Sequence, residues 1–178
     1  SRLEMEYTLR KCILELVSSP NFQQSHRNAL TILGDYYGAE RTCLCVFREE
    51  ENLELYEWYA DRKESLLDEE GTLKEKYKNG VWSSEELTTR PLILDNIDKL
   101  HQSYPEYYQS LMEQQIWSMY SLPLQHNEVR GTIYVINPKR HLGDLTVLNL
   151  LSVFLAAEVS KRVLWEKQEY ELNYDKLT

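Results

Sequence analysis

Two cysteines separated by one residue, Cys43 and Cys45, are the first side chains to consider for chemistry. In a β-strand, side chains two positions apart point to the same face, so the two thiols would lie together and could ligate a metal or be oxidised. A metal site needs further thiolate or imidazole ligands, and no histidine or second cysteine pair stands at ligand spacing. The pattern therefore favours two buried structural thiols and no metal site.

Acidic side chains offer a second kind of chemistry. Asp61, Asp68, Glu69 and Glu70 have the types required for general acid and base catalysis, but an acidic run in a loop is usually a solvated surface. The chain contains no Ser-His-Asp order, phosphate-binding loop, dinucleotide-binding glycine motif or HExxH zinc motif. The sequence therefore predicts a protein that is not an enzyme, with no catalytic residues and no resident cofactor.

Composition and charge describe a single soluble domain. The chain has 178 residues, of which 42% are apolar and 28% are charged, as in ordinary globular proteins. A net charge of -9 argues against binding to nucleic acid or anionic lipid, because both need clustered Lys and Arg. No run approaches the ~18 apolar residues that span a bilayer, and three cysteines are too few for a disulfide framework. A reducing, cytoplasmic location without direct membrane contact is the expectation.

The N-terminal third of the chain predicts two helices followed by two strands. Apolar residues from Met5 to Leu16 recur at steps of three and four, as on one face of an amphipathic helix, and a second such pattern runs from Gln24 to Tyr37. Gly38 supplies the stop of the second helix. Segments 41–48 and 52–60 are rich in β-branched, apolar and aromatic residues, and the acidic run 49–51 between them predicts a hairpin turn.

The middle of the chain predicts an insertion, three further strands and a helix. Residues 61–90 are polar, with Trp82 as the only large anchor, and are too long for a plain connection, so they predict a lid or pocket wall. Segment 91–94 predicts a strand, 104–115 a helix with Ser103 as N-cap, and 116–124 and 129–137 the arms of a hairpin. This order predicts an α+β fold around a central, mainly antiparallel sheet.

A long helix is predicted to close the chain. It begins near Asp144, and its apolar positions run from Leu145 to Leu172, a stretch of 28 residues that would be ~40 Å long. A domain of this size cannot cover that length, so the excess is expected to pack on the same helix of a second subunit, beside the N-terminal helix, in a homodimer. Leu155 and Val159 are expected to lie in the apolar seam between the subunits.

The second hairpin allows the two faces of the sheet to be predicted. Pairing Leu124 with Val129, and placing Leu53 and Leu55 with the other aliphatic side chains, gives one face suited to helix packing. The other face would combine aromatic side chains with hydroxyls and thiols, as a small-ligand site requires. The candidate pocket residues are Cys43, Cys45, Tyr56, Trp58, Trp82, Met119, Ser121 and Tyr134. A filled second core beneath the insertion is the alternative.

The chain carries several short local sequences in a definite order: Glu57-Trp58, Trp82, Pro91-Leu92-Ile93-Leu94-Asp95, Gln115-Ile116-Trp117-Ser118, Leu122-Pro123-Leu124, Gly131 and Asn137-Pro138. Together with the order of elements, they resemble a GAF domain of the kind that precedes GGDEF (diguanylate cyclase) domains in bacterial signalling proteins. The match covers about Leu9 to Lys161, and the C-terminal Asp175-Lys176-Leu177-Thr178 resembles the Asp-x-Leu-Thr start of a GGDEF domain. The helix that leads there has no terminating signal, so the chain is expected to be part of a larger protein.

The resemblance implies a sensory module with the terminal helices on one sheet face and a pocket walled by helices and loops on the other. Several features of known GAF branches are missing. The chain lacks the Asn-Lys-x-Phe-Asp-Glu pattern of the cyclic-nucleotide-binding branch, and Cys43 and Cys45 fall on a predicted strand rather than in the wall helices where bilins attach. No histidine is singled out as a haem ligand, and the loop thiols of GAF-fold methionine sulfoxide reductases have no counterpart. The ligand is therefore left open.

Three segments with separate roles are expected. Residues 1–20 would form the N-terminal helix of a dimer bundle, 21–161 the GAF sensory domain, and 162–178 a signalling helix leading to an output domain in cis, expected to be a diguanylate cyclase that makes cyclic di-GMP. The predicted function is a non-catalytic sensory domain that binds a small ligand. A structural dimerisation module without ligand is the first alternative, and a methionine sulfoxide reductase-like enzyme is the second.

Overall fold

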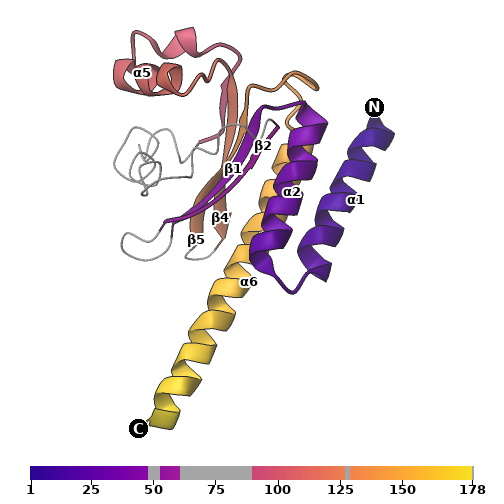
Figure 1. Cartoon of the computed structure of the whole chain (residues 1–178), viewed down its shortest axis with the longest axis vertical. Coiled ribbons are helices and arrows are strands. Elements are labelled where there is room, and N and C mark those ends of the chain that lie inside the picture. The colour runs from indigo at the N-terminus through magenta and orange to yellow at the C-terminus, as the bar shows by residue number, and fades with distance from the viewer. Residues whose placement is uncertain (48–52, 61–89, 127–128, 178) are drawn as a thin grey trace.

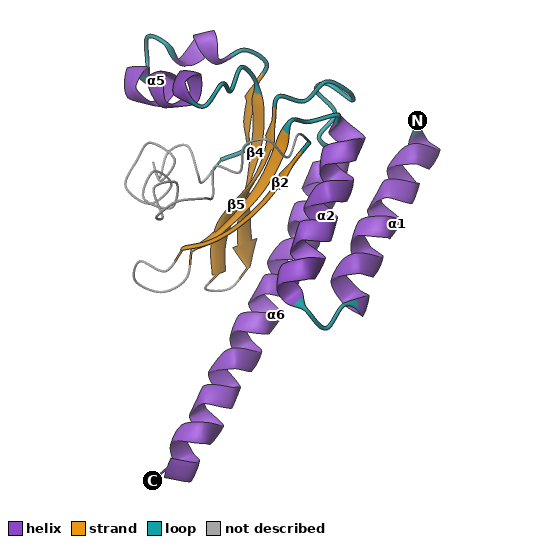
Figure 2. Cartoon of the chain, in the orientation of Figure 1, coloured by secondary structure: helices purple, strands orange, loops and turns teal. Residues whose placement is uncertain are grey.

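The structure is a computed structural model that describes residues 1–47, 53–60, 90–126 and 129–177. Its strands form a five-stranded antiparallel sheet in the order β2-β1-β5-β4-β3 (Figures 1 and 2), which confirms the predicted α+β class. The helices are α1 (Arg2–Ser18), α2 (Phe22–Tyr37), the short 3-10 helix η2 (Ile97–Leu100), α5 (Pro105–Glu113) and α6 (Thr146–Leu177). The strands are β1 (Arg41–Phe47), β2 (Leu53–Tyr59), β3 (Leu92–Leu94), β4 (Met119–His126) and β5 (Val129–Ile136). The predicted turn 49–51 and nearly all of the insertion 61–90 lie outside the described residues.

Local sequence explains how α2 begins and ends. The Asn21 side chain caps the first turn by accepting a hydrogen bond from the backbone N–H of Gln24 at 3.2 Å. At the other end, Gly38 adopts a left-handed conformation with φ of 56°, which glycine reaches without a clash from a Cβ. The predicted second helix and its stop are therefore confirmed.

The region before α5 differs in detail from the prediction. The cap position of α5 is held by Tyr104, with no side-chain cap hydrogen bond, rather than by Ser103, and Pro105 begins the helix. The turn η2 was not predicted. It begins where the Asn96 side chain accepts a hydrogen bond from the backbone N–H of Asp98 at 2.9 Å.

Three helices form a layer on one face of the sheet. α2 and α6 contact the strands, and α1 packs against both of these helices (Figure 1). The core between this layer and the sheet is apolar and includes Leu30, Leu33, Leu44, Ile133 and Leu148, each at most 1% exposed. Burial of such side chains, at about 2 kcal/mol each, is the main contribution that holds the helices to the sheet.

The opposite face of the sheet carries α5 and η2 (Figure 2). Ile97 of η2 and Tyr107 and Leu111 of α5 belong to a second buried cluster with Met119 and Tyr134 of the sheet. The sheet is therefore buried on both faces, and its two faces are covered by different elements. We refer to them as the helix face, under α1, α2 and α6, and the α5 face.

The pairing of β4 with β5 is shifted by two residues from the predicted register. His126 pairs with Val129, so the predicted pairing of Leu124 with Val129 is wrong. A shift of two residues keeps each side chain on its original face, because the side-chain period of a strand is two. Ser121 and Tyr134 still point to the same face, as predicted.

α6 extends beyond the rest of the fold. It has 32 residues, and the Asp144 side chain accepts a hydrogen bond from the backbone N–H of Thr146 at 3.0 Å at its start. Arg162 is its last buried residue, and from Leu164 onward every described side chain except the half-buried Glu166 is exposed. This distal part projects past the sheet in Figure 1. Among the helices of the described ranges, none combines the length and the apolar character that a bilayer crossing needs.

Candidate functional site

One row of side chains crosses all five strands on the α5 face. In the order of the strands, each member pairs with the next across the sheet: Glu57, Cys43, Tyr134, Ser121 and Leu92. Directly paired residues of antiparallel strands point to the same face, so these side chains are neighbours. The row therefore places a carboxyl, a thiol, a phenol and a hydroxyl in line, starting from β2 at the edge of the described sheet.

Glu57 is a buried carboxyl with an unused acceptor. The residue is 8% exposed, and the Tyr59 hydroxyl donates to its Oε2, whereas Oε1 accepts no hydrogen bond from any residue that the structure describes. Burial raises the pKa of Glu57 from 4.5 to about 7, against the lowering effect of the Arg41 charge. Buried polar atoms are normally paired, so Oε1 is an acceptor that a donor on a ligand could use.

Arg41 connects this carboxyl to α5. The residue is 4% exposed, its Nη2 donates to Oε1 of Gln114 at 3.4 Å, and its guanidinium lies 5.7 Å from the centre of the Tyr59 ring. Because Tyr59 also bonds to Glu57, these groups form one polar cluster that spans β1, β2 and the end of α5. We call Arg41, Glu57, Tyr59 and Gln114 the Glu57 cluster.

The thiols of Cys43 and Cys45 are buried on the same face. Both residues are 0% exposed, and burial raises the pKa of Cys45 well above its usual value. A thiol that stays protonated is a poor nucleophile and a poor metal ligand. Within the described ranges, no group of three or more His, Cys, Asp or Glu side chains could hold a metal ion.

Two of the predicted pocket residues, Tyr56 and Trp58, lie on the helix face instead. Tyr56 pairs with Leu44 and shares its core, and Trp58 packs against the same core. The Trp58 ring occupies the space beside Gly34 of α2, where a Cβ would overlap it. The prediction that both residues line the pocket is therefore wrong. The placement of Leu55 with the helix core is wrong for the same reason, because Leu55 packs in the cluster on the α5 face.

Of the remaining predicted pocket residues, all that the structure describes lie on the α5 face. The structure brings together on the α5 face Cys43, Cys45, Met119, Ser121 and Tyr134. Trp82 lies outside the described residues. Sequence reasoning missed Glu57 and Arg41, although the pairing of Glu57 with Cys43 would have placed the carboxyl once the register of β1 and β2 was known.

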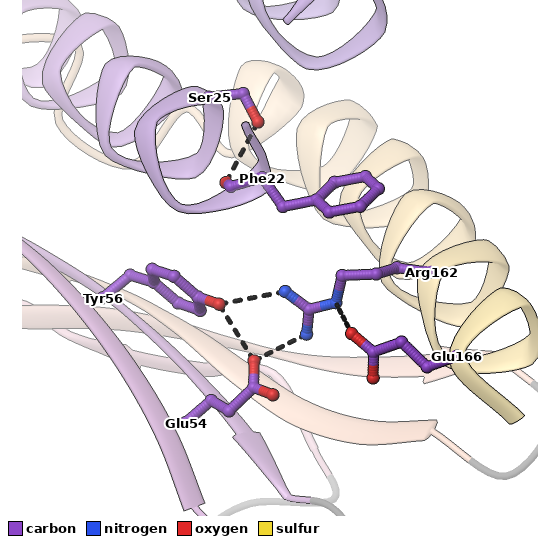
Figure 3. A network of polar contacts seen from close by, with 6 residues as sticks. All are labelled: Phe22, Ser25, Glu54, Tyr56, Arg162 and Glu166. Atoms are coloured by element: carbon purple, nitrogen blue, oxygen red, sulfur yellow. Dashed lines mark hydrogen bonds and ion pairs between the residues drawn. The ribbon is translucent and has the colours of Figure 1, made fainter. Parts of the chain in front are cut away.

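A second polar cluster lies on the helix face, where β2 holds Arg162 of α6 (Figure 3). Arg162 is 5% exposed; its Nη2 donates to Oε2 of Glu54 at 2.6 Å, and its Nη1 donates to the Tyr56 hydroxyl at 3.0 Å. The same hydroxyl donates to Oε2 of Glu54 at 2.9 Å. Oε1 of Glu166 lies 3.9 Å from Nε of Arg162, and the Phe22 ring centre lies 5.6 Å from its guanidinium. We call Arg162, Glu54 and Tyr56 the Arg162 cluster.

A cleft of about 690 Å³ opens beside the Arg162 cluster, between the start of α2, β2 and α6. Close by, His26 of α2 is 1% exposed and its ring packs on Tyr56 with a centroid distance of 4.9 Å. Burial, helped by the Arg162 charge, lowers the pKa of His26 from 6.5 to about 4. His26 is therefore neutral at pH 7, and the buried charge beside it is that of Arg162.

Comparison with known proteins identifies the fold. No protein-family model matches the chain, and no curated protein matches it. Among solved structures, the GAF domain of a phosphoenolpyruvate-protein phosphotransferase from Coxiella burnetii has a TM-score of 0.64 at 18% identity, over 93% of this chain and 98% of that chain. The phycoerythrobilin-bound GAF domain of a cyanobacterial phytochrome has a TM-score of 0.65 at 12% identity, over 93% and 100%. The chromophore-binding domain of a bacteriophytochrome from R. palustris has a TM-score of 0.69 at 15% identity, over 94% and 63%.

The chain therefore has the GAF fold, as the sequence resemblance predicted. At these identities the similarity shows the fold alone, because one fold serves many functions and function has to be argued from the site. The chromophore binding of the two phytochrome domains is a property of those proteins. The link to a GGDEF domain and the division of the chain into 1–20, 21–161 and 162–178 stay predictions.

Proposed function

We propose that this chain is a non-catalytic sensory domain that binds a small ligand on the α5 face and signals through α6. The observation that carries the proposal is the buried carboxyl of Glu57, one oxygen of which has no hydrogen-bond partner within the described ranges. This carboxyl stands in one row with Cys43, Tyr134 and Ser121. A ligand that donates a hydrogen bond to Glu57 and covers the rest of the row would complete the polar contacts of this face.

A ligand held without a covalent bond fits these residues better than an attached bilin. One structure with a similar fold holds bound biliverdin, and the phycoerythrobilin-bound GAF domain holds phycoerythrobilin. Here the chain has three cysteines. Cys43 and Cys45 are fully buried in β1, and Cys12 belongs to the core of the helix face. Attachment to a thiol requires an accessible thiolate, which none of these sites offers.

A domain that follows α6, expected to be a diguanylate cyclase, would receive the signal. The support is the projecting distal part of α6 and the Asp175-Lys176-Leu177-Thr178 spelling at its end. A ligand could regulate that domain only through different affinities for two arrangements of α6. Reading the coding sequence beyond Thr178 and assaying the longer protein for cyclic di-GMP synthesis tests this part. A different domain after Thr178 would contradict the proposed cyclase but would not contradict the proposed sensory role.

A homodimer through α1 and α6 belongs to the same proposal. Large apolar side chains are exposed on both helices, among them Val17 at 63% on α1 and Val153 at 71% on α6. Leu155 and Val159, the expected seam positions, are instead buried within the subunit at 1% and 0% exposed. The proposed seam therefore consists of exposed residues of the two helices, because contiguous exposed apolar surface marks an interaction site.

Sedimentation at micromolar concentration tests the dimer. Val153→Glu combined with Leu164→Glu should weaken it by placing charge in the seam, since both side chains are more than half exposed in the single chain. Leu142→Glu is the matched control, because Leu142 is 67% exposed but lies outside the helices. An unshifted monomer for the unchanged protein would contradict the dimer.

The close packing of the α5 face supports a second candidate, a structural dimerisation module without ligand. Cys43, Cys45 and Met119 are 0% exposed and Tyr134 is 3% exposed, and all four belong to one cluster with α5 and η2. In this candidate the α5 face is a filled second core. The buried carboxyl of Glu57 then destabilises the fold, and no ligand offsets the loss. The reductase-like alternative has no supporting observation, because it needs reactive thiols.

Thermal unfolding in the presence of cell metabolites separates the two candidates. A ligand that binds only the folded state at roughly 100 times its Kd should raise Tm by about 5 °C or more. Glu57→Gln should reduce this increment, whereas Glu106→Gln, an exposed change on α5, should keep it. If no compound shifts Tm and a ligand-free crystal structure shows the α5 face closed by its own side chains, the scaffold candidate replaces the sensor.

A further inference from the structure

β2 is the one strand that contributes to both polar clusters. Its side chains alternate between the faces, so Glu54 and Tyr56 reach the Arg162 cluster while Glu57 and Tyr59 belong to the Glu57 cluster. The strand also forms one edge of the described sheet, with a single paired neighbour, β1. A strand held on one side can move more easily than a strand held on both. A displacement caused on the α5 face must therefore carry Glu54 and Tyr56 with it.

Arg162 is bound to β2 tightly enough to follow such a displacement. Two nitrogens of one guanidinium bond to two side chains of β2, at 2.6 Å to Glu54 and 3.0 Å to Tyr56, and Tyr56 also bonds to Glu54. Charge-assisted hydrogen bonds of this kind are among the strongest in proteins. With Arg162 only 5% exposed, separation from β2 would leave its charge buried without its main partner. Movement of β2 thus either moves α6 or breaks the cluster.

The position of Arg162 on α6 allows this contact to affect the direction of the distal part of the helix. It is the last buried residue of the helix, and the side chains beyond Glu166 are all exposed where they are described. Upstream, Leu151, Leu155 and Val159 hold α6 in the core of the helix face. The distal part therefore leaves the domain just after Arg162, where Val163 still packs against the core, and the contacts made there set its direction (Figures 1 and 3).

We propose that Arg162 is a positioning residue that ties α6 to β2 and passes a displacement of this strand to the projecting part of α6. The adjacent cleft of about 690 Å³ provides the space into which the side chains of the cluster can move. The inference rests on the proposed function in one respect: the displacement is taken to come from a ligand on the α5 face. The mechanical link itself can be tested without any ligand.

Distances between two nitroxide labels test the link. Asp35→Cys on α2 and Glu171→Cys on distal α6 are both exposed positions, whereas the native cysteines are 0% exposed and should stay unlabelled. Dilution with excess unlabelled protein isolates the distance within one chain of a dimer. Glu57→Leu then serves as the perturbation on the α5 face, because it removes the buried carboxyl and its bond to Tyr59. We expect it to shift the mean distance by about 1 to 2 Å, the usual size of helix shifts.

The same perturbation in an Arg162→Met background should leave the distance unchanged. Lys161→Met is the matched control, because it removes the same charge from the exposed neighbouring position and should preserve the response. If Arg162→Met does not fold, Arg162→Lys, which cannot reach both partners in the same geometry, should reduce the response. Equal shifts with and without Arg162 would overturn the proposal, as would the absence of a shift in the unchanged background. A purely structural Arg162 would lower Tm but leave the response intact. Because no ligand is used, the result is separate from the outcome of the metabolite screen.

Discussion

The two faces of the sheet differ in how their buried charged groups are paired. Both faces bury apolar side chains together with thiols and phenols. On the helix face the buried guanidinium of Arg162 is paired with Glu54, whereas on the α5 face one oxygen of the buried Glu57 carboxyl accepts no hydrogen bond within the described ranges. A buried polar group lowers stability unless it is paired. The α5 face thus carries a loss of stability that a binding site would explain.

The largest expected effect comes from placing the same polar residue on the two faces. Leu44 and Cys43 are adjacent in β1 and both 0% exposed, with side chains on opposite faces. Leu44→Ser should lower the free energy of unfolding by about 4 kcal/mol, because it leaves a cavity and buries a hydroxyl. Cys43→Ser, nearly isosteric, should cost about 1 to 2 kcal/mol. Urea denaturation measures both. A loss for Cys43→Ser as large as that for Leu44→Ser would show that the α5 face tolerates polar atoms no better than the helix face.

The pH dependence of stability should reveal one titrating group on each face. The raised pKa of Glu57 gives stability that is present below pH 4.5 and lost as pH rises through about 7. The lowered pKa of His26 gives stability that is present above pH 6.5 and lost as pH falls through about 4. Each effect amounts to about 3 kcal/mol. They oppose each other, so the unchanged protein should show a shallow profile.

Single variants should separate these two contributions. Glu57→Gln should lose stability on acidification below pH 6.5, because His26 remains. His26→Gln should lose stability as pH rises from 4.5 to 7, because Glu57 remains. Denaturation at several pH values measures the slopes. Asp144, whose pKa is lowered by its hydrogen bonds to Thr146, adds the same loss in acid to all three proteins. Parallel profiles for the three would remove the assignment of one titrating group to each face.

The Arg162 cluster should show how the helix face tolerates charge. The Arg162 side chain is 5% exposed and the Glu54 side chain 28% exposed, so the pair is only partly screened by water. Glu54→Gln should cost about 2 kcal/mol, because it leaves the guanidinium buried without its carboxylate. Glu54→Leu combined with Arg162→Met should recover most of that loss, since it removes both charges. Additive losses in this cycle would mean that the two side chains do not stabilise each other.

The smallest effect concerns local opening. If the α5 face opens to admit a ligand, Cys43 and Cys45 should react with a maleimide about tenfold or more faster than Cys12, because local opening needs less free energy than global unfolding. All three thiols are 0% exposed, so each reacts only after the structure opens. Peptide mapping by mass spectrometry gives the three rates. Equal rates would indicate that both faces open only when the whole domain unfolds.

The order of elements and the faces of the β4–β5 hairpin could be predicted from the sequence. Helical spacing and the Gly38 stop define α2, and an error of two in the register of β4 and β5 leaves every side chain on its face. β2 could not be assigned in this way. Its faces were predicted by grouping leucines against aromatics, but Tyr56 and Trp58 are on the helix face with Leu44. An aromatic ring and a leucine are both good core residues, so type alone cannot decide the face.

The two polar clusters could not be predicted from the sequence, for a different reason. Arg162 stands in a helix where most charged side chains are solvated, and nothing in its neighbours indicates that β2 will bury it. Glu57 looked like one of several acidic residues on a strand. Both clusters depend on contacts between residues far apart in the chain, such as Arg162 and Glu54. These contacts exist only once the helices and strands have packed together.

Because the distal part of α6 is exposed, its length determines how anything after it is rotated about the helix axis. Each residue of an α-helix turns the chain by ~100°, so whatever follows the exposed stretch is oriented by the number of residues between it and Arg162. Inserting one residue there would rotate the downstream part by ~100°, whereas inserting seven would return it to within ~20° of its original azimuth. If a domain follows α6, as proposed, the exposed segment would orient that domain, and changes of its length in whole heptads would disturb the orientation least.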